Sequence, residues 1–247
     1  MHDFLGFPDA SVVVVTGAGS GIGAATAALA AAAGLAVSVW DRDVAAAREI
    51  VDRIVSSGRQ AQAVGLDVTD EGAVRTAFAA CEARLGPVGL LVNNAGPANT
   101  DDLTFHEGIA DTLGCAGTVL AAWLETDGAE NGAVVNVASV CGTMSGGGAS
   151  AWYPAGKAGI AGYTRWLAVH RPRGIRANAV APGATSTPRT KTVLEGPEGR
   201  RLLASNPMRC FAQPADVAAS VLFLLSPAAG HINGVVLPVD GGLSLAW

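Results

Sequence analysis

The chain has 247 residues, a formal net charge of −5 at pH 7, 50% hydrophobic residues and 15% charged residues. This length and hydrophobic content predict a folded protein with a sizeable core and exclude a disordered chain. The acidic balance disfavours nucleic acid and anionic membranes, so we expect neither as a main partner.

Strands and helices are predicted to alternate along the whole chain, with no linker or low-complexity break. Strands are predicted over residues 11–16, 35–40, 60–66, 88–92, 133–138, 175–181 and 235–239, and helices over 24–33, 44–57, 71–85, 103–126, 153–170 and 214–225. This alternation predicts one domain over residues 1–247. Its fold class is α/β, a doubly wound Rossmann-type parallel sheet of about seven strands with helices on both faces.

The four cysteines are widely spaced and the four histidines are isolated, which predicts reduced thiols and no metal site. The first residues lack a basic segment, so we expect no signal peptide and a cytoplasmic protein. Residues 21–40 carry no charge, but they are rich in Ala and Gly and open with a glycine motif. They predict a loop, a helix and a strand rather than a membrane span.

A glycine-rich loop follows the first predicted strand, which contains four consecutive valines. Such a β-branched apolar run is typical of a buried parallel strand. Because a helix N-terminus and bare loop amides can hold a pyrophosphate, the order strand, loop and helix predicts a dinucleotide site rather than a tight turn alone. The candidate residues are Gly17, Ser20, Gly21, Ile22 and Gly23.

Asp41 ends the second predicted strand, about twenty residues past the glycine loop. Its carboxylate can accept hydrogen bonds from both adenosine ribose hydroxyls and would repel a 2′-phosphate. It can equally close a turn or cap the next helix. Arg42 follows and could meet a phosphate, but Asp41 and the neutral Ser20 favour NAD over NADP.

Polar and small residues also follow the third and fourth predicted strands. Asp67, with Val68 after it, stands where an open α/β sheet binds ligands and can touch an adenine edge. Asp67 can instead cap the following helix. The run Asn93-Asn94-Ala95-Gly96 can line the floor of a cofactor site or form only a turn.

Ser139 stands at the end of the fifth strand, and Tyr153 and Lys157 lie four residues apart at the start of a helix. This spacing places the phenol and the ammonium on one helix face. A cation beside a phenol lowers the pKa of the tyrosine from its usual value of about 10, which suits proton exchange with an alcohol or a carbonyl. The pair can also be an ordinary surface pair. The run Gly146-Gly147-Gly148 before it predicts a loop.

A long segment rich in Gly, Pro and Thr follows the sixth strand, and we expect a substrate loop at about residues 184–213. Its basic residues outnumber its acidic ones, which predicts either a solvated surface or recognition of an anionic substrate group. The basic residues are Arg189, Lys191, Arg200, Arg201 and Arg209, against Glu195 and Glu198.

Together these motifs resemble the short-chain dehydrogenase/reductase family over nearly the whole chain. The resemblance rests on the glycine loop, the Asn-Asn-Ala-Gly run, Ser139 with Tyr153 and Lys157, and Pro182-Gly183 with Thr187. It implies catalysis by Ser139, Tyr153 and Lys157, with Ser139 binding the substrate oxygen. It also implies an NAD site that comprises Gly17, Ser20, Gly21, Ile22, Gly23, Asp41, Asp67, Val68, Asn94, Ala95, Gly96, Tyr153, Lys157, Pro182, Gly183, Thr185 and Thr187.

Two positions depart from the family pattern. Gly114 aligns with the asparagine that usually holds a relay water, which implies that protons pass through another group or directly to solvent. Pro154 replaces a small polar residue, which a first helical turn tolerates. The family also implies a homodimer or homotetramer, and the small residues from Ala155 to Gly162 would permit close helix packing.

The resemblance predicts an oxidoreductase that moves a hydride between NAD(H) and a secondary alcohol or ketone. Reduction of 3-oxoacyl thioesters is an alternative motivated by the basic loop, and a sensor that binds NAD(H) without chemistry is another. Pro97, Cys141 and Trp152 are expected to border the substrate with the 184–210 loop, although Trp152 can equally pack in the core.

Overall fold

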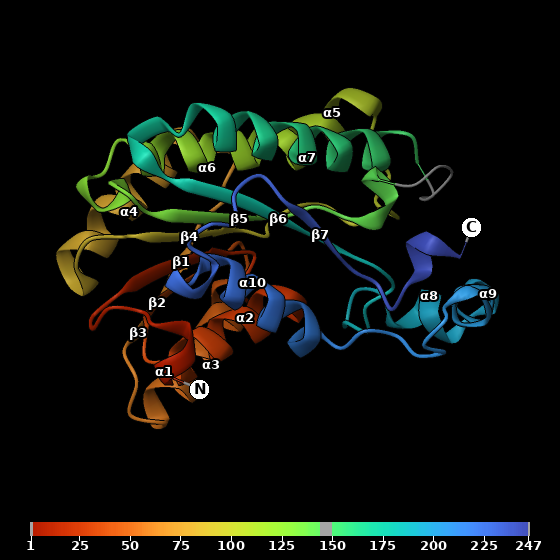
Figure 1. Cartoon of the computed structure of the whole chain (residues 1–247), viewed down its shortest axis with the longest axis horizontal. Coiled ribbons are helices and arrows are strands. Elements are labelled where there is room, and N and C mark those ends of the chain that lie inside the picture. Colours follow the sequence, from red (N-terminus) through yellow and green to blue (C-terminus); the bar gives the residue numbers. More distant parts are fainter. Residues whose placement is uncertain (1, 144–149, 247) are drawn as a thin grey trace.

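The computed structural model describes residues 2–143 and 150–246 (Figure 1). Seven parallel strands form one sheet in the order β3-β2-β1-β4-β5-β6-β7, which confirms the predicted doubly wound fold. The strands are β1 (Val12–Thr16), β2 (Ala36–Asp41), β3 (Ala61–Gly65), β4 (Leu90–Asn93), β5 (Ala133–Val137), β6 (Arg176–Pro182) and β7 (Val236–Val239). The predicted Gly146-Gly147-Gly148 loop lies outside the described residues.

Helices cover both faces of the sheet (Figure 1). One face carries α2 (Gly21–Ala32), α3 (Val44–Ser56) and α10 (Pro214–Leu225), and the other carries α4 (Glu71–Leu85), α6 (Cys115–Leu124) and α7 (Trp152–His170). The valines of β1 alternate between these faces: Val13 and Val15 belong to one hydrophobic cluster, and Val12 and Val14 to the other. A continuous valine run is therefore what a strand buried on both sides requires.

β1 pairs with β2 on one side and with β4 on the other. The chain thus winds outward in opposite directions from this point, and parallel sheets bind ligands beyond the carboxyl ends of the strands at such a reversal. Of the described helices, none is both long enough and apolar enough to cross a membrane.

The helix predicted over residues 103–126 is present as one continuous helical run over residues 105–124, in which the structure distinguishes three parts. These are α5 (Phe105–Ile109), a π-helical turn (Ala110–Gly114) and α6. The π turn packs closely on α7, where a Cβ added to Gly156 would lie 2.9 Å from the Thr112 Cβ. Added at Gly159, it would lie 2.8 Å from the Leu113 Cδ2. These glycines serve packing within the chain, and the contact places the π turn beside the helix that carries Tyr153.

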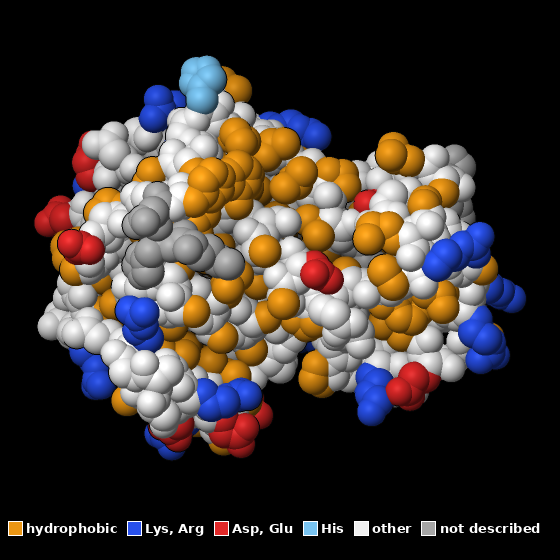
Figure 2. All heavy atoms as spheres, turned by 60° about the horizontal axis from the view of Figure 1, so that its bottom comes forward, with side chains coloured by type: hydrophobic (Ala, Val, Ile, Leu, Met, Phe, Trp, Pro, Cys, Tyr) orange, Lys and Arg blue, Asp and Glu red, His pale blue; other side chains and the backbone are white. Residues whose placement is uncertain are grey.

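The predicted loop after β6 also contains regular structure, namely α8 (Lys191–Glu195) and α9 (Pro197–Ser205). Together they form a lobe to one side of the sheet (Figure 1), and blue Lys and Arg side chains gather on it in Figure 2. The remaining short helix, α1 (His2–Leu5), lies below the sheet in the view of Figure 1 and contacts the 3-10 turn Pro227–Ala229.

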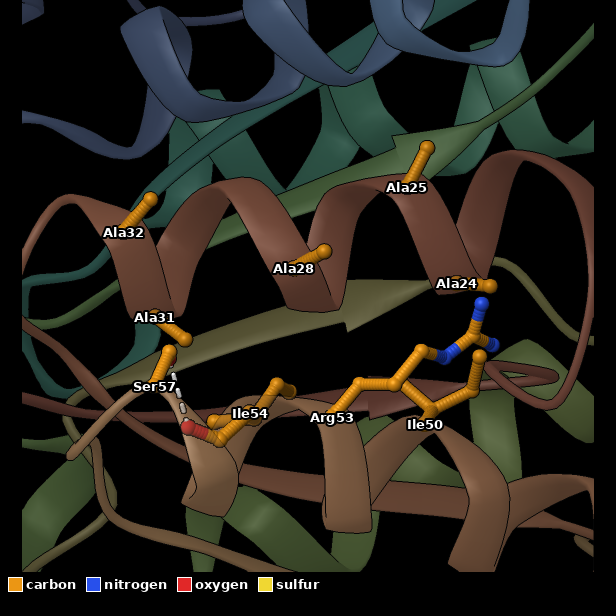
Figure 3. Close-up of a pocket in the computed structure, with 9 residues that line it drawn as sticks. All are labelled: Ala24, Ala25, Ala28, Ala31, Ala32, Ile50, Arg53, Ile54 and Ser57. Carbon is orange, nitrogen blue, oxygen red and sulfur yellow. Dashed lines mark hydrogen bonds between the residues drawn. The ribbon is translucent and has the colours of Figure 1, made fainter.

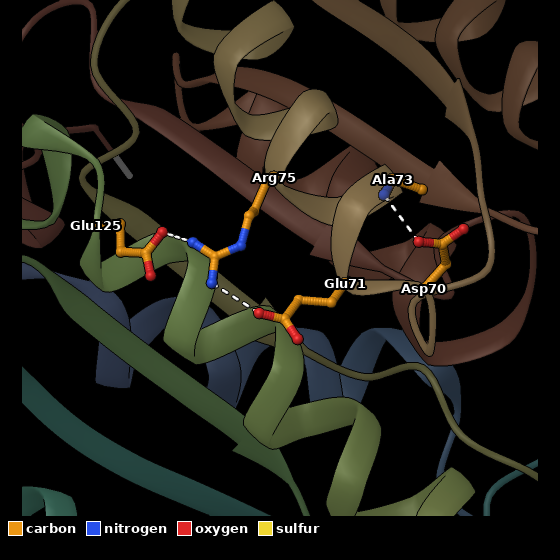
Figure 4. Close-up of polar contacts among 5 residues, drawn as sticks. All are labelled: Asp70, Glu71, Ala73, Arg75 and Glu125. Carbon is orange, nitrogen blue, oxygen red and sulfur yellow. Dashed lines mark hydrogen bonds and ion pairs between the residues drawn. The ribbon is translucent and has the colours of Figure 1, made fainter.

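Arg75 joins α4 to the end of α6 (Figure 4). Its guanidinium pairs with Glu71 at 2.7 Å and also with Glu125. All three side chains are substantially exposed, so we expect a double-mutant cycle of Arg75→Ala and Glu125→Ala to give a coupling below about 1 kcal/mol. Urea unfolding at low and high salt measures it, and a larger coupling that survives high salt would contradict a screened surface pair.

Candidate functional site

A cleft of about 860 Å³ opens beyond the carboxyl ends of the strands. Among the residues that line it are Asp41 at the end of β2, Asn94 just after β4, Ser139 just after β5 and Pro182 at the end of β6. Every site residue expected from the sequence lines this cleft, with the exception of Gly23. The tertiary structure therefore brings together expected site residues from seven separate segments of the chain.

The glycine loop is held tightly against the end of β4. Gly17 has φ +61°, and a Cβ there would lie 2.8 Å from the Ala95 Cα. The Asn94 Nδ2 donates to the carbonyls of Thr16 and Gly17, at 2.9 Å each. Gly23 lies behind the loop, where a Cβ would collide with the Gly17 carbonyl. Gly23 thus lets α2 approach the loop rather than lining the cleft.

The N-terminus of α2 faces the cleft without a side-chain cap. In the described chain the Ser20 hydroxyl makes no capping hydrogen bond, and the first turn holds no acidic residue. The cleft is lined here by Ser20, Gly21 and Ile22. Uncapped amides at the positive end of a helix suit an anion, and the bare loop beside them leaves room for its approach. These residues fit a dinucleotide pyrophosphate.

Asp41 points back toward the glycine loop. Its Oδ2 accepts from the Gly19 amide at 2.8 Å, and its Oδ1 accepts from the Asp43 amide at 2.9 Å. The cap of α3 is Asp43, whose side chain accepts from Ala45 and Ala46. Asp41 is therefore a turn residue and a cleft residue at once, and it is not the helix cap.

Asp67 lies further along the same edge of the sheet. Hydrogen bonds from the backbone and hydroxyl of Thr69 lower the pKa of its carboxyl group. Asp70, rather than Asp67, caps α4. Since Asp67 and Val68 both line the cleft, they lie where the sequence placed an adenine edge.

The carboxyl end of β5 and the first turns of α7 bring together Ser139, Tyr153 and Lys157. The Lys157 side chain is buried, and its Nζ donates to the Val137 carbonyl at 2.8 Å. Nζ also lies 5.8 Å from the centroid of the Tyr153 ring. The Ser139 hydroxyl accepts from the Cys141 amide at 3.2 Å, and a hydrogen bond between Ser139 and Tyr153 lowers the pKa of the phenol. Pro154 sits in the first turn of α7, as a proline can.

The prediction of a lowered pKa for Tyr153 is nevertheless wrong for the protein without a bound cofactor. Burial is the largest effect and raises the pKa of Tyr153 above its ordinary value, which the hydrogen bond from Ser139 offsets only in part. Burial also lowers the pKa of Lys157 to about 8, because a desolvated ammonium is unfavourable. Near and above pH 8, Lys157 is therefore partly neutral and stabilises a phenolate less than a fully charged ammonium would.

Three expectations about the rest of the pocket have different outcomes. Pro97 and Cys141 line the cleft. Trp152 is buried and packs on Gly108, where a Cβ would collide with the indole ring, so it belongs to the core. Gly114 is exposed and absent from the cleft lining among the described residues.

The sequence argument missed several cleft residues. Asp111 and Cys115, one turn apart around the π turn, line the cleft on either side of the Gly114 position. Burial raises the pKa of the Cys115 thiol to about 11. Helical spacing could have found this pair, whereas Leu243 reaches the cleft from beyond β7 and carries no local signal.

A second hollow, of about 320 Å³, lies between α2 and α3 (Figure 3). Ala24 and Ala31 of α2 face the α3 side of the hollow, which Ile50, Arg53 and Ile54 line. The hollow follows from short side chains in a helix–helix groove, and the Ser57 hydroxyl that lines it donates to the Ile54 carbonyl. Within residues 2–143 and 150–246, no three His, Cys, Asp or Glu side chains gather to hold a metal ion.

Comparison with known proteins agrees with this geometry. Residues 17–244 match the family model described as enoyl-(acyl carrier protein) reductase. The chain is 39% identical to cis-4-hydroxycyclohexanecarboxylate dehydrogenase of Sinomonas cyclohexanicum, over 94% of this chain and 95% of the relative. It is 36% identical to galactitol 2-dehydrogenase (L-tagatose-forming) of Cereibacter sphaeroides, over 96% of each chain.

Solved structures give the same result. A 7α-hydroxysteroid dehydrogenase complexed with NADH and 7-oxo glycochenodeoxycholic acid superposes with a TM-score of 0.88 and 32% identity, covering 95% of this chain and 94% of the other. A short-chain dehydrogenase from Burkholderia cenocepacia in complex with NADP gives a TM-score of 0.86 and 31% identity, covering 95% and 98%. With its seven-stranded sheet and a match over nearly its full length, the chain belongs to the short-chain dehydrogenase/reductase family of oxidoreductases.

Proposed function

We propose that the protein transfers a hydride between NAD(H) and a secondary alcohol or ketone, with Tyr153 as general acid and base. The observation that carries this proposal is the meeting of Ser139, Tyr153 and Lys157 in the cleft that the glycine loop borders. The galactitol and cis-4-hydroxycyclohexanecarboxylate dehydrogenases support a small alcohol as the substrate class.

In this mechanism the Ser139 hydroxyl donates to the substrate oxygen and stabilises the charge that develops on it. Tyr153 accepts the hydroxyl proton when the alcohol is oxidised and returns it when the carbonyl is reduced. The bound nicotinamide supplies or accepts the hydride. Lys157, anchored by the Val137 carbonyl, holds a positive charge beside the phenol and orients the ribose hydroxyls. Burial desolvates both Tyr153 and Lys157, so charges beside them act in a low dielectric. A small change in local charge therefore shifts the proton between Tyr153 and the substrate oxygen.

The cofactor assignment follows the cleft from one end to the other. Asp67 and Val68 would hold the adenine, Asp41 the adenosine ribose, and the glycine loop with the α2 N-terminus the pyrophosphate. The nicotinamide half would lie against Asn94, Ala95, Gly96, Pro182, Gly183, Thr185 and Thr187. The solved structures include one with NADH and one with NADP, so the preference for NAD rests on the carboxylate of Asp41.

Asp41→Asn should weaken the discrimination against NADP. A carboxylate close to a 2′-phosphate repels it by several kcal/mol in a partly exposed site, so removing the charge should raise kcat/KM for NADP by about 10²-fold. Steady-state kinetics with both cofactors measure the ratio. Asp43→Asn is the matched control, because Asp43 caps α3 with the same chemistry and lies outside the cleft lining. An unchanged ratio in the Asp41 variant would remove Asp41 from cofactor selection.

The proposal is tested by assaying the purified protein with NAD and NADP against polyols, hydroxysteroids, cyclic hydroxy acids and 3-hydroxyacyl thioesters. We expect turnover of at least one secondary alcohol with NAD. Tight NADH binding without turnover of any member would contradict an enzyme and favour a sensor. Of the basic loop residues that motivate the thioester alternative, Arg189 lines the described cleft, whereas Arg200 and Arg201 lie on α9 outside that lining.

We propose in addition that the chain forms a homodimer or homotetramer through α7. Two large apolar side chains of this helix are exposed, Trp166 at 52% and Val169 at 79%. Burying such a surface against a second copy would remove apolar area from water. Light scattering of the wild type and of Val169→Lys tests this, and a wild-type monomer at micromolar concentration would refute it.

A further inference from the structure

Arg189 bridges the cleft. It lies just after the Thr185–Thr187 segment that follows β6, and its Nη1 donates to the carbonyl of Gly96, beyond β4, at 3.0 Å. The backbone around Arg189 is fixed by hydroxyl groups. The Thr190 hydroxyl donates to the Thr185 carbonyl at 2.6 Å and accepts from the Thr187 amide at 3.0 Å. The guanidinium is therefore held at the cleft by its own turn, with one of its N–H groups engaged by Gly96.

The charge of Arg189 reaches the reacting groups. It lowers the pKa of Tyr153 and that of Lys157, although burial acts more strongly on each. Among the described residues, no carboxylate lies within ion-pair distance of Arg189, whereas Lys191 pairs with Glu195 and Arg201 with Glu198. Asp101, another acid of the cleft, is engaged by the Ala98 amide at 2.8 Å. Arg189 thus presents positive charge to the cleft without an ion-pair partner among the described residues, although Asp111 and Glu198 also line the cleft.

Arg189 is exposed at the cleft, and part of the cleft lining is apolar, which narrows the class of partner. The apolar residues of the cleft lining include Val140, Val193, Leu194, Leu202 and Leu243. The other basic residues of the substrate loop differ in position. Arg201 lies on α9 and Arg209 donates to the Ala204 carbonyl, and neither belongs to the described cleft lining.

We propose that Arg189 binds a carboxylate of the substrate, and that the substrates are secondary alcohols or ketones that join an apolar carbon skeleton to a carboxylate. This inference rests on the proposed function and specifies its substrate class. The planar guanidinium has donors left to engage a carboxylate, and the apolar wall accommodates the skeleton between that carboxylate and the reacting carbon. Arg189 is a specificity residue in this scheme and takes no part in proton or hydride transfer.

The test compares hydroxy acids with their uncharged amides of the same shape, for example 4-hydroxycyclohexanecarboxylate with 4-hydroxycyclohexanecarboxamide and 3-hydroxycyclohexanecarboxylate with its amide. For the wild type we expect kcat/KM for the acid to exceed that for the amide by about 10–100-fold, as a charge-assisted hydrogen bond allows. Arg189→Met should abolish the preference by raising KM for the acid alone, and Arg189→Lys should restore part of it. Arg200→Met, an exposed arginine outside the cleft, should leave it unchanged.

Three results would overturn the proposal. An equal kcat/KM for acid and amide in the wild type excludes carboxylate recognition. If Arg189→Met lowers kcat/KM equally for acid and amide, Arg189 only holds its loop to Gly96 and does not bind the carboxylate. A weaker Kd for NADH in Arg189→Met, with the acid preference retained, shows a cofactor ligand.

A binding measurement keeps this test separate from the proposed function. Calorimetric titration of the NADH complex of Tyr153→Phe with 4-oxocyclohexanecarboxylate and 4-oxocyclohexanecarboxamide requires no turnover. Tighter binding of the acid, lost on adding Arg189→Met, supports the carboxylate site even where the turnover assay fails. Equal binding of acid and amide overturns it even where alcohols are oxidised.

Discussion

Tyr153→Phe should lower kcat/KM by about 10²–10⁴-fold in both reaction directions, because it removes the group that exchanges the proton with the substrate oxygen. Phenylalanine keeps the ring that packs edge-on against Trp152 at 5.7 Å between centroids. The first turn of α7 and the position of Lys157 should therefore survive. The loss should appear mainly in kcat, with the Kd for NADH and the Tm close to those of the wild type.

Tyr163→Phe is the matched control, since Tyr163 is the other tyrosine of the chain and lies about three turns further along α7. Its ring stacks near Trp166, and it is absent from the described cleft lining. Stopped-flow or steady-state assays of both variants with the same alcohol give the comparison. Activity retained in Tyr153→Phe, or an equal loss in Tyr163→Phe, would disprove the acid–base role of Tyr153.

Lys157→Met should abolish most activity and yet raise the Tm at neutral pH by roughly 2–4 °C, which corresponds to about 1 kcal/mol. Burial lowers the pKa of Lys157 to about 8, which means that the folded protein holds the charged form at a cost. Methionine fills a similar volume without a charge. The gain is reduced because the Val137 carbonyl, which accepts from Nζ at 2.8 Å, loses its partner.

The pH dependence of this difference has a definite sign. The folded pKa of Lys157, about 8, lies below its ordinary value of 10.5, so the unfolded chain binds the proton more tightly. The free-energy cost of burying the charged Lys157 is therefore complete below pH 8 and disappears as the pH rises toward 10.5. The Tm advantage of Lys157→Met should shrink over this range and reverse above it, where the neutral amine still donates to Val137.

Thermal unfolding of the two proteins between pH 7 and 10.5 measures this crossover. Other titrating groups are common to both proteins and cancel in the difference. The control is Lys191→Met, the second lysine of the chain, whose side chain is 71% exposed on α8 and should show no such pH trend. A Tm advantage that stays constant with pH would show that the ammonium of Lys157 carries no burial cost.

The sequence by itself determined the sheet and which segments meet at its carboxyl edge. Four valines in a row require a strand buried on both faces, and strand–helix alternation leads to a doubly wound sheet whose loops gather at one edge. The glycine loop, Asp41, Ser139 and the Tyr153–Lys157 pair each stand beside a predicted strand or helix end. Backbone periodicity therefore sufficed to bring them to one place.

Only the tertiary structure decided the properties that depend on distant contacts. Gly156 and Gly159 of α7 lie close to the side chains of the π turn. The indole of Trp152 packs on Gly108, which places Trp152 in the core. Arg189, rather than its neighbours on α9, reaches Gly96 across the cleft. Burial raises the pKa of Tyr153 although its spacing from Lys157 predicts the opposite, because desolvation is set by everything packed around a group and not by the residues next to it in the chain.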